Sequence, residues 1–232
     1  MQPEFLKCFK RMVSEPRFNA FRGGNGNPDA DAISRYIWNI ALCESLYPAF
    51  QILEVSFRNA LHVEVAKIVG STDWLTGAPR FLYAPELDTI TSAKAELQAQ
   101  GKRPTEPYLV SQLKFGFWTS LLDSRYDKVW HKVIKGVFPG MPRTIRTRGE
   151  ASSRMNTVRR LRNAALHHHS IWHWNDLEEQ HRDCRTLIAW LGESGSVVAN
   201  SVDRFPEVFK SGPQSFHATV STFRINVPPA SP

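Results

Sequence analysis

AFQILEVSFRNALHVEVAKIVG, residues 49–70, is the stretch that decides the fold. Its apolar side chains recur at the three- and four-residue intervals of an α-helix, and it ends on a glycine, a common helix stop. The core-facing stripe comprises Phe50, Leu53, Phe57, Leu61 and Ile68. The pattern predicts a long helix from Ala49 to Val69 that buries one face.

The same helical periodicity continues on both sides of this stretch. It predicts helices at 3–13, 32–47, 85–100, 107–122, 125–138, 151–168, 175–191 and about 202–210. Pro48 is expected to interrupt or kink the chain, because proline has no N–H to donate. Gly116 would permit close helix packing. Strand-like alternation is confined to SFHATVSTFRINV at 215–227.

These elements predict an all-α helical bundle. The expected divisions are an N-terminal helix and loop at 1–28, a helical domain at 29–210 and a loosely attached C-terminal tail at 211–232. The chain has 232 residues, and 42% of them are hydrophobic, including 14 Phe and 7 Trp. This composition supplies a sizeable core and excludes a disordered chain.

The composition also bounds the compartment. No apolar run approaches the roughly 18–20 residues of a membrane-spanning helix, and the first residues lack the apolar segment of a signal peptide. The three cysteines, Cys8, Cys43 and Cys184, form no C-x-x-C pair. A reduced, cytoplasmic protein with no membrane partner is the expectation.

Positive charge is concentrated in one part of the sequence. The formal net charge is +7, and residues 101–185 alone sum to +8. Seven arginines between 143 and 162 oppose only Glu150. Guanidinium groups chelate phosphate oxygens, so this run predicts binding to a polyanion; the alternative is a solvated helix face. The candidate residues for binding a polyanion such as RNA are Arg143, Arg146, Arg148, Arg154, Arg159 and Arg160.

The densest polar cluster follows this run, in RNAALHHHSIWH at 162–173. Asn163 and His167 are one helical turn apart, so the amide is placed to orient the imidazole. Arg162 and His167 are five residues apart, about 140° around a regular helix. The two would meet at one phosphate only if the helix ends or bulges there, or if two copies of the chain face each other.

Three interpretations of the cluster remain open. His169 and His173, spaced by one turn, suggest zinc, but no cysteine or paired carboxylate lies nearby to complete a tetrahedral site, and no metal is expected. A structural cluster that caps the helix is the second interpretation. The third is acid–base chemistry on a phosphodiester, because imidazole titrates near neutrality and guanidinium holds positive charge.

A second polar stripe follows one face of the long helix. Glu54, Arg58 and His62 are spaced by one turn, and Glu54 precedes Arg58 in the favourable order for an ion pair. Such a stripe either forms a buried hydrogen-bonded network or lines a pocket, and it is a candidate support for the site. The sequence contains none of the common glycine-rich phosphate-binding loops, so no nucleotide cofactor is expected.

The R-N-x-x-x-H-H pattern at 162–168 resembles the signature of the Abi-like proteins, bacterial abortive-infection factors of the HEPN superfamily. YIWNIALCESLYPAFQILEVSFRNALH (36–62), DWL (73–75), KFGFWTSLL (114–122) and VFP (137–139) are similar to that family in order and spacing. The resemblance covers roughly residues 30–192. Common members differ from this chain at Ala164, His169 and Ser170.

The resemblance implies a HEPN-like helical domain that pairs as a homodimer and cleaves RNA without a metal or other cofactor. The 2′-hydroxyl would attack the adjacent phosphorus and leave a 2′,3′-cyclic phosphate. By position, Arg162 would stabilise the phosphate charge, His167 would move a proton and Asn163 would orient the pair, with His168 as the reserve candidate.

The implied role is a toxin or antiviral abortive-infection effector in the bacterial cytoplasm. Its expected partners are RNA, a second copy of the chain, and an antitoxin or phage-derived trigger. The alternative is a catalytically inactive HEPN module that binds RNA or a partner protein as an infection sensor.

Overall fold

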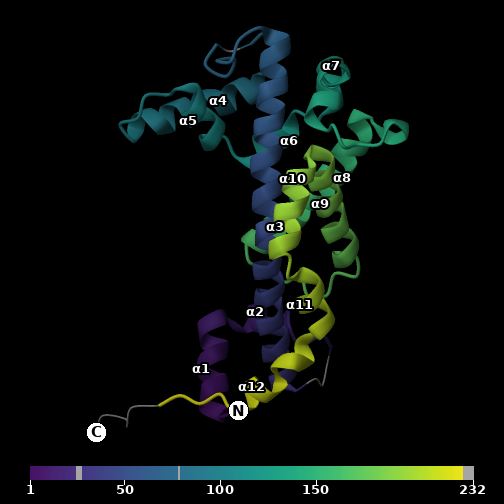
Figure 1. Ribbon diagram of the computed structural model, residues 1–232. Helices are drawn as coiled ribbons and strands as arrows, with labels where there is room; N and C mark the ends of the chain where they lie inside the picture. The colour runs from purple at the N-terminus through teal and green to yellow at the C-terminus, as the bar shows by residue number, and fades with distance from the viewer. Residues whose placement is uncertain (25–27, 78, 227–232) are drawn as a thin grey trace. The chain divides into compact units, whose positions relative to one another are not determined.

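The computed structural model describes residues 1–24, 28–77 and 79–226, and Figure 1 shows that these residues form helices joined by short connections. No β-strand occurs in the described ranges, so the all-α prediction is confirmed. No helix in them is long and apolar enough to cross a membrane. Residues 25–27 of the expected N-terminal loop and 227–232 of the expected tail lie outside the described residues.

The chain divides into two compact units, each assembled from separate stretches of sequence. Unit 1 comprises residues 1–47, 162–178 and 203–232, and unit 2 comprises 48–161 and 179–202. The helical pattern of the sequence instead predicts boundaries near residues 28 and 210. The units differ from that expectation because two long helices, α3 (Asp29–Val69) and α8 (Arg148–Leu166), contribute residues to both.

Unit 1 is built around a small aromatic core. Its elements are α1 (Pro3–Val13), α2 (Glu15–Asn19), the first part of α3, the end of α8, α11 (Phe205–Ser211), η3 (Pro213–Phe216) and α12 (His217–Ser221). Phe18, Phe21, Ala32, Ile33 and Val220 are buried in one cluster. Residues from the beginning and the end of the sequence therefore share one core.

The expected loose tail is wrong for the described residues beyond 211. Val220 is fully buried, and the Phe5 and Phe223 rings lie 5.1 Å apart. The Gln2 N–H donates to the Phe223 carbonyl at 3.0 Å. The weak strand expectation at 215–227 is also corrected, because residues 213–221 form η3 and α12. Apolar side chains that seemed to alternate along a strand instead pack at helical spacing against α1 and α2.

Unit 2 holds most of the large buried side chains. Its elements are the rest of α3, α4 (Ala84–Ala99), α5 (Glu106–Gln112), α6 (Phe115–Ser120), η1 (Ser124–Tyr126), α7 (Asp127–Val137), η2 (Arg143–Ile145), most of α8, most of α9 (Leu177–Leu191) and α10 (Glu193–Val202). Trp74 packs edge-to-face on Trp118, and Trp130 stacks on Phe138. The sequence analysis did not predict α10.

Two expected helix boundaries differ in the structure. α3 runs through Pro48, because the buried residues on both sides, such as Leu46 and Phe50, keep the helical spacing and outweigh the missing hydrogen bond. The single helix expected at 107–122 is instead α5 and α6, separated at Leu113 and Lys114. The backbone is extended there, and the Leu113 carbonyl accepts from the Trp118 indole at 3.2 Å.

Candidate functional site

The predicted motif lies at the C-terminal end of α8, in unit 1. The His167 N–H donates to the Asn163 carbonyl at 2.9 Å, as in a regular helix. The His168 N–H then donates to Ala165, and the His169 N–H donates to Ala164 at 2.8 Å. This pair of bonds is a Schellman motif, which needs a left-handed residue at its turn.

His168 occupies that left-handed position, with φ of 60°. Glycine is the usual residue there, because a side chain in this conformation is strained. Strain of this kind persists only where the surroundings fix the backbone. The segment that follows α8 should therefore be firmly held, and side chains of α2 and α3 hold it.

Asn39 of α3 is the first. Its side chain is buried, with 4% exposed. Its Oδ1 accepts from the Ile171 N–H at 2.7 Å and the Trp172 N–H at 3.1 Å, and its Nδ2 donates to the His169 carbonyl at 3.3 Å. One amide thus satisfies three backbone groups of the segment.

Arginines 17 and 35 hold the other side of the same segment. Arg17 donates to the His168 carbonyl at 2.6 Å. Arg35 lies 5.3 Å from the Trp172 ring and donates to the Arg22 carbonyl at 2.6 Å. The Trp172 indole in turn donates to the Ala20 carbonyl at 3.2 Å. Residues 168–172 are therefore fixed to α2 and α3 within unit 1.

Sequence reasoning missed Arg17, Arg35 and Asn39. Asn39 had a detectable signal, because it is a polar residue inside the apolar run of the 32–47 helix. Such a residue is buried only when its hydrogen bonds are satisfied. Arg17 and Arg35 had no such signal, since each looks like any other surface arginine.

The imidazoles of His167, His168 and His169 are exposed at this helix end. Their side chains make no hydrogen bond or ion pair within the described part of the chain. The same part contains no group of three or more His, Cys, Asp or Glu side chains placed to hold a metal ion. The imidazoles are open to a ligand from solvent.

Arg162 and Asn163 are brought together, but Asn163 and His167 are not. The Arg162 guanidinium donates to the Asn163 Oδ1 at 3.2 Å, and both side chains are half-buried. No hydrogen bond joins the Asn163 side chain to the His167 imidazole among the described residues. Because α8 is regular up to His167, Arg162 and His167 leave the helix about 140° apart.

The six candidate RNA-binding arginines lie in unit 2, and three of them bind carbonyl or carboxylate oxygens of the protein. Arg146 donates to the Met141 carbonyl. Arg148 pairs with the Asp127 carboxylate. These contacts stabilise the unit, so such side chains are less available to phosphate than the sequence run suggests.

Arg154 is the most heavily engaged of the three. It pairs with Glu150 at 2.7 Å and with Asp183, and it lies 5.5 Å from the Trp190 ring. The two carboxylates raise the pKa of the guanidinium against the opposing effect of burial. Arg143 and Arg160 are exposed instead, and Arg159 lines a pocket.

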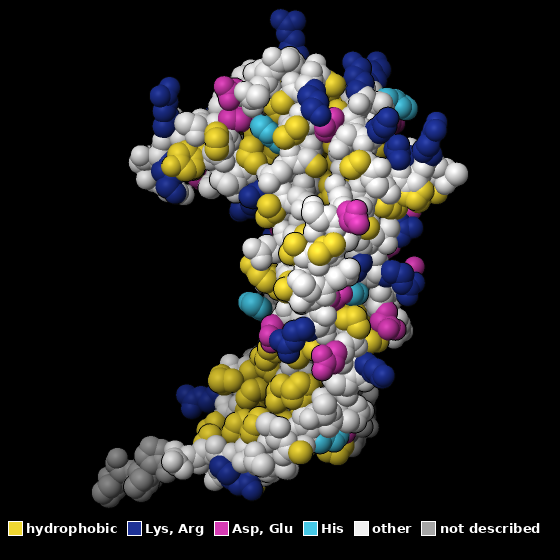
Figure 2. Space-filling model, in the orientation of Figure 1, with side chains coloured by type: hydrophobic (Ala, Val, Ile, Leu, Met, Phe, Trp, Pro, Cys, Tyr) yellow, Lys and Arg dark blue, Asp and Glu magenta, His cyan; other side chains and the backbone are white. Residues whose placement is uncertain are grey.

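A basic face on α7 was not singled out from the sequence. Figure 2 shows Lys and Arg side chains gathered around α7 in unit 2, and hydrophobic side chains gathered over unit 1. Lys128, Lys132 and Lys135 are exposed at helical spacing on α7. The signal was present in the sequence, because these residues contribute to the positive balance of 101–185.

The expected supporting stripe lies on the part of α3 that belongs to unit 2. His62 pairs with the buried Glu106 at 2.9 Å and stacks on Trp74. Glu106 also accepts from two backbone N–H groups, of Leu75 and Thr76. His62 therefore belongs to a structural network, as one of the two interpretations held. Glu54 and Arg58 are half-buried, and Arg58 and His62 line a pocket.

Chemically, the end of α8 offers a fixed backbone, a half-buried guanidinium and solvent-exposed imidazoles. Such groups can hold an anionic phosphate and exchange protons with it. The sequence matches no protein-family model, and neither the curated proteins nor the solved structures contain a match.

Proposed function

We propose that the protein is a metal-independent endoribonuclease of the HEPN type. The observation that carries this proposal is the row of exposed imidazoles at a strained, firmly held helix end that also bears Arg162 and Asn163. The resemblance of residues 162–168 to the Abi-like signature supports it. The exposed lysines of α7 and the exposed Arg143 and Arg160 add positive charge for a polyanion.

In the proposed reaction the RNA supplies its own nucleophile. A base takes the proton of the 2′-hydroxyl while its oxygen forms a bond to phosphorus, and the bond from phosphorus to the 5′-oxygen breaks. An acid donates a proton to that leaving oxygen. His167 is the proton-transfer group, with His168 in reserve, and Arg162 stabilises the extra negative charge on phosphorus.

The proposal includes a homodimer. Arg162 and His167 diverge around α8, so a two-fold arrangement would let two copies complete one cleft. Unit 1 carries an apolar feature suited to self-association, because Ile40 and Tyr47 are 53% and 51% exposed on α3, two turns apart. A strict monomer in light scattering at tens of micromolar, with cleavage intact, would refute this part.

The proposed role is that of a toxin or antiviral abortive-infection effector in the bacterial cytoplasm, restrained by an antitoxin or released by a phage-derived trigger. The resemblance to the Abi-like family is the support for it. A toxin should be difficult to produce in wild-type form, whereas an inactive variant should accumulate normally.

The second candidate is a binding module without catalysis. It is favoured by one observation: the Asn163 side chain accepts from Arg162, and no side chain of the described residues orients the His167 imidazole by a hydrogen bond. Such a module would bind RNA or a partner protein and sense infection. It would show affinity for RNA and no product.

RNA cleavage in EDTA, with mapping of the product ends, separates the two candidates. The nuclease should release 2′,3′-cyclic phosphate and 5′-hydroxyl ends in the wild type, and the His167→Ala variant should not. Binding without cleavage supports the module. Cleavage that disappears in EDTA and returns with added metal would overturn the metal-independent proposal.

A further inference from the structure

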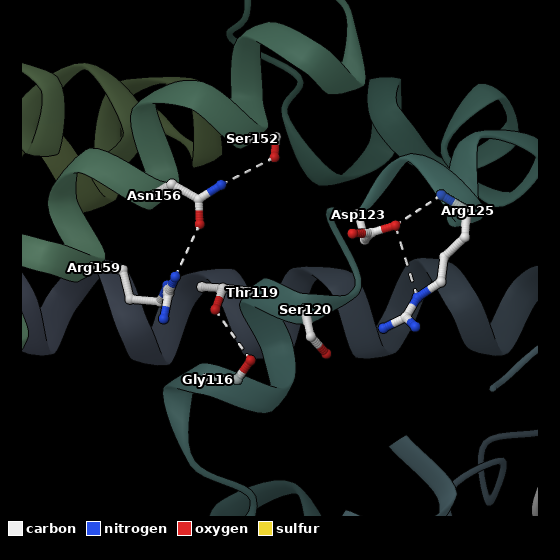
Figure 3. Close-up of a pocket in the computed structure, with 8 residues that line it drawn as sticks. All are labelled: Gly116, Thr119, Ser120, Asp123, Arg125, Ser152, Asn156 and Arg159. Carbon is white, nitrogen blue, oxygen red and sulfur yellow. Dashed lines mark hydrogen bonds and ion pairs between the residues drawn. The ribbon is translucent and has the colours of Figure 1, made fainter. Parts of the chain in front are cut away.

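Unit 2 contains a polar pocket of about 250 Å³ that is separate from the candidate cleavage residues at the end of α8. Figure 3 shows side chains from α6, from α8 and from the segment around η1 pointing into it. Its polar lining includes Thr119, Ser120, Arg125, Ser152, Asn156 and Arg159. Hydroxyl, amide and guanidinium groups therefore replace the apolar lining that is typical of drug-like sites.

Arg159 brings an uncompensated positive charge to the α8 side of the pocket. Within the described residues its Nη2 donates to the Asn156 Oδ1 at 3.4 Å, and its Nε is shielded from water and has no hydrogen-bond partner. No carboxylate pairs with it among the described residues. A guanidinium that no carboxylate neutralises can donate hydrogen bonds to an anion that enters the pocket.

Arg125, on the η1 side, is already neutralised. It donates to the buried Glu86 at 2.7 Å, and the Ser120 hydroxyl and the Tyr126 phenol donate to the same carboxylate at 2.9 and 2.6 Å. Desolvation and the bond to Glu86 raise the pKa of Tyr126 and keep its proton in place. The anion should therefore bind at Arg159.

Asp123 lies beside Arg125 and presents a carboxylate to the pocket. Its Oδ1 accepts from the Arg125 N–H at 3.0 Å, while its Oδ2 has no hydrogen bond within the described residues. A carboxylate repels phosphate but accepts hydrogen bonds from sugar hydroxyls, as acidic residues do in dinucleotide-binding folds. The two sides of the pocket thus prefer different parts of one ligand.

Gly116 forms part of the floor between them. Its φ is not positive, and a Cβ built there would meet no heavy atom within 4 Å in the described structure. The packing role expected from the sequence is therefore wrong. Glycine in a helix costs about 0.5–1 kcal/mol relative to alanine, and neither backbone conformation nor packing requires it here. A side chain at this position would extend into the open space of the pocket.

We propose that this pocket binds a ribose phosphate unit. The phosphate lies against Arg159 with Asn156 and Ser152, and the ribose hydroxyls donate to Asp123. The unit is a free ribonucleotide or one nucleotide of an RNA strand. The proposal shares Arg159 with the expected RNA-binding segment, but it requires binding alone and stands whether or not the protein cleaves RNA.

Calorimetric titration of the full chain with uridine 5′-monophosphate tests it. Arg159→Ala should weaken binding at least about tenfold, because hydrogen bonds to charged groups contribute about 1.5–3 kcal/mol. Arg103→Ala, at an exposed arginine outside the pocket lining, is the matched control and should bind as the wild type does. Equal affinity in the Arg159→Ala and wild-type chains would overturn the proposal.

The ribose part has its own test. The 2′,3′-dideoxy nucleotide should bind more weakly than the ribonucleotide in the wild type, and Asp123→Ala should remove that difference. If inorganic phosphate binds as tightly as the nucleotide, the ribose assignment is wrong. Thermal unfolding of each variant verifies that it is folded.

Gly116 provides a steric variant that leaves every polar group in place. Gly116→Leu should fill the pocket and abolish nucleotide binding, whereas Gly116→Ala should retain it, and both should be at least as stable as the wild type. Nucleotide binding that survives Gly116→Leu would place the ligand elsewhere.

Competition identifies the source of the ligand. An RNA octamer that displaces the nucleotide indicates a strand bound through this pocket, and a DNA octamer of the same sequence should compete less well. Nucleotide binding without displacement by RNA indicates a free ribonucleotide. Absence of both nucleotide and RNA binding in the wild type refutes the site.

Discussion

The two parts of α8 use their polar side chains in different ways. In residues 148–161, Arg148 and Arg154 bind carboxylates of their own protein. In the segment that follows Leu161, the imidazoles of residues 167–169 are exposed, and the backbone beneath them carries the hydrogen bonds. Two of the arginines in the first part thus stabilise the fold through ion pairs. The strained helix end in the second part carries the candidate catalytic residues.

The largest expected effect is a loss of RNA cleavage in variants of the candidate residues at the end of α8. His167→Ala should reduce RNA cleavage about 10²–10⁴-fold, the usual contribution of a positioned acid or base. Arg162→Lys should also reduce RNA cleavage, because the point charge of lysine does not replace the bidentate guanidinium. Single-turnover cleavage of a defined RNA measures both.

His173→Ala is the matched control for this experiment, because His173 is also an exposed histidine but lies outside the motif. It should retain most of the activity. If His168→Ala alone removes cleavage, the reserve residue is the proton-transfer group. Wild-type rates in folded His167→Ala and His168→Ala chains would show that the proposed site is wrong.

The second prediction concerns the backbone at that helix end. Asn39→Ala should lower the free energy of unfolding by about 2–4 kcal/mol, because it leaves three buried or partly buried backbone groups of residues 169–172 without this partner. Chemical denaturation measures this loss. Asn175→Ala, at an exposed asparagine, should change stability by less than about 0.5 kcal/mol. Equal losses in the two variants would mean that Asn39 does not hold the segment.

The third prediction concerns the framework arginines, Arg148 and Arg154, which form ion pairs within the protein. Arg154→Ala should lower the free energy of unfolding by about 1–3 kcal/mol, because it leaves the partly buried Asp183 unpaired and removes the contact with Trp190. Arg160→Ala, on the same helix but exposed, should stay within about 0.5 kcal/mol of the wild type. If denaturation curves show a larger loss of stability in Arg160→Ala than in Arg154→Ala, the distinction between paired and exposed arginines on α8 is wrong.

Much of the fold was predictable, and the reasons for the failures are specific. Helical periodicity located most of the helices, because most of them bury one face, but it did not predict α2, α10 or α12. It could not show that the chain turns at Leu113 and that Phe115 and Trp118 are buried after this turn. It also could not show that Val220 shares a core with Phe18. Both depend on contacts that are not local in sequence.

The candidate site divides in the same way. The sequence places Arg162, Asn163 and the histidines in one short segment, and the structure exposes the histidines at a helix end; their role in proton transfer stays a prediction. The hydrogen bond that Arg162 donates to the Asn163 Oδ1 could not be predicted, because spacing on a helix shows which residues are neighbours but not which hydrogen bond forms. Nor did the arginine run reveal that Arg154 has two carboxylate partners, one of them on α9.

The fourth prediction tests how well the surface beneath residues 168–172 is closed to water. Burial raises the pKa of the Cys43 thiol to about 11, although the nearby Arg17 lowers it. A raised folded-state pKa stabilises the protein below the ordinary value near 9, and that contribution is lost as the pH rises toward 11. The stability of the wild type relative to Cys43→Ala should therefore fall between pH 9 and 11.

Chemical denaturation across that range measures the effect, and the comparison cancels the alkaline titration of other groups such as Tyr126. Cys8→Ala is the control, because Cys8 is exposed. It should follow the wild-type curve. A relative stability that is independent of pH would show that water reaches Cys43.

The smallest expected effect is on the salt dependence of RNA affinity, and it tests whether the exposed arginines contact phosphate. If Arg143 and Arg160 contact phosphate, each should contribute about −0.7 to the slope of log affinity against log salt on single strands. The double Ala variant should therefore flatten the slope by about 1.4, with little loss of stability. Arg103→Ala, outside the basic run, should leave it unchanged. Fluorescence anisotropy with an RNA oligomer in the His167→Ala background measures binding without cleavage. If replacing Lys132 and Lys135 flattens the slope and the arginine variant does not, the phosphate-binding surface is the face of α7, and the arginine run serves the fold.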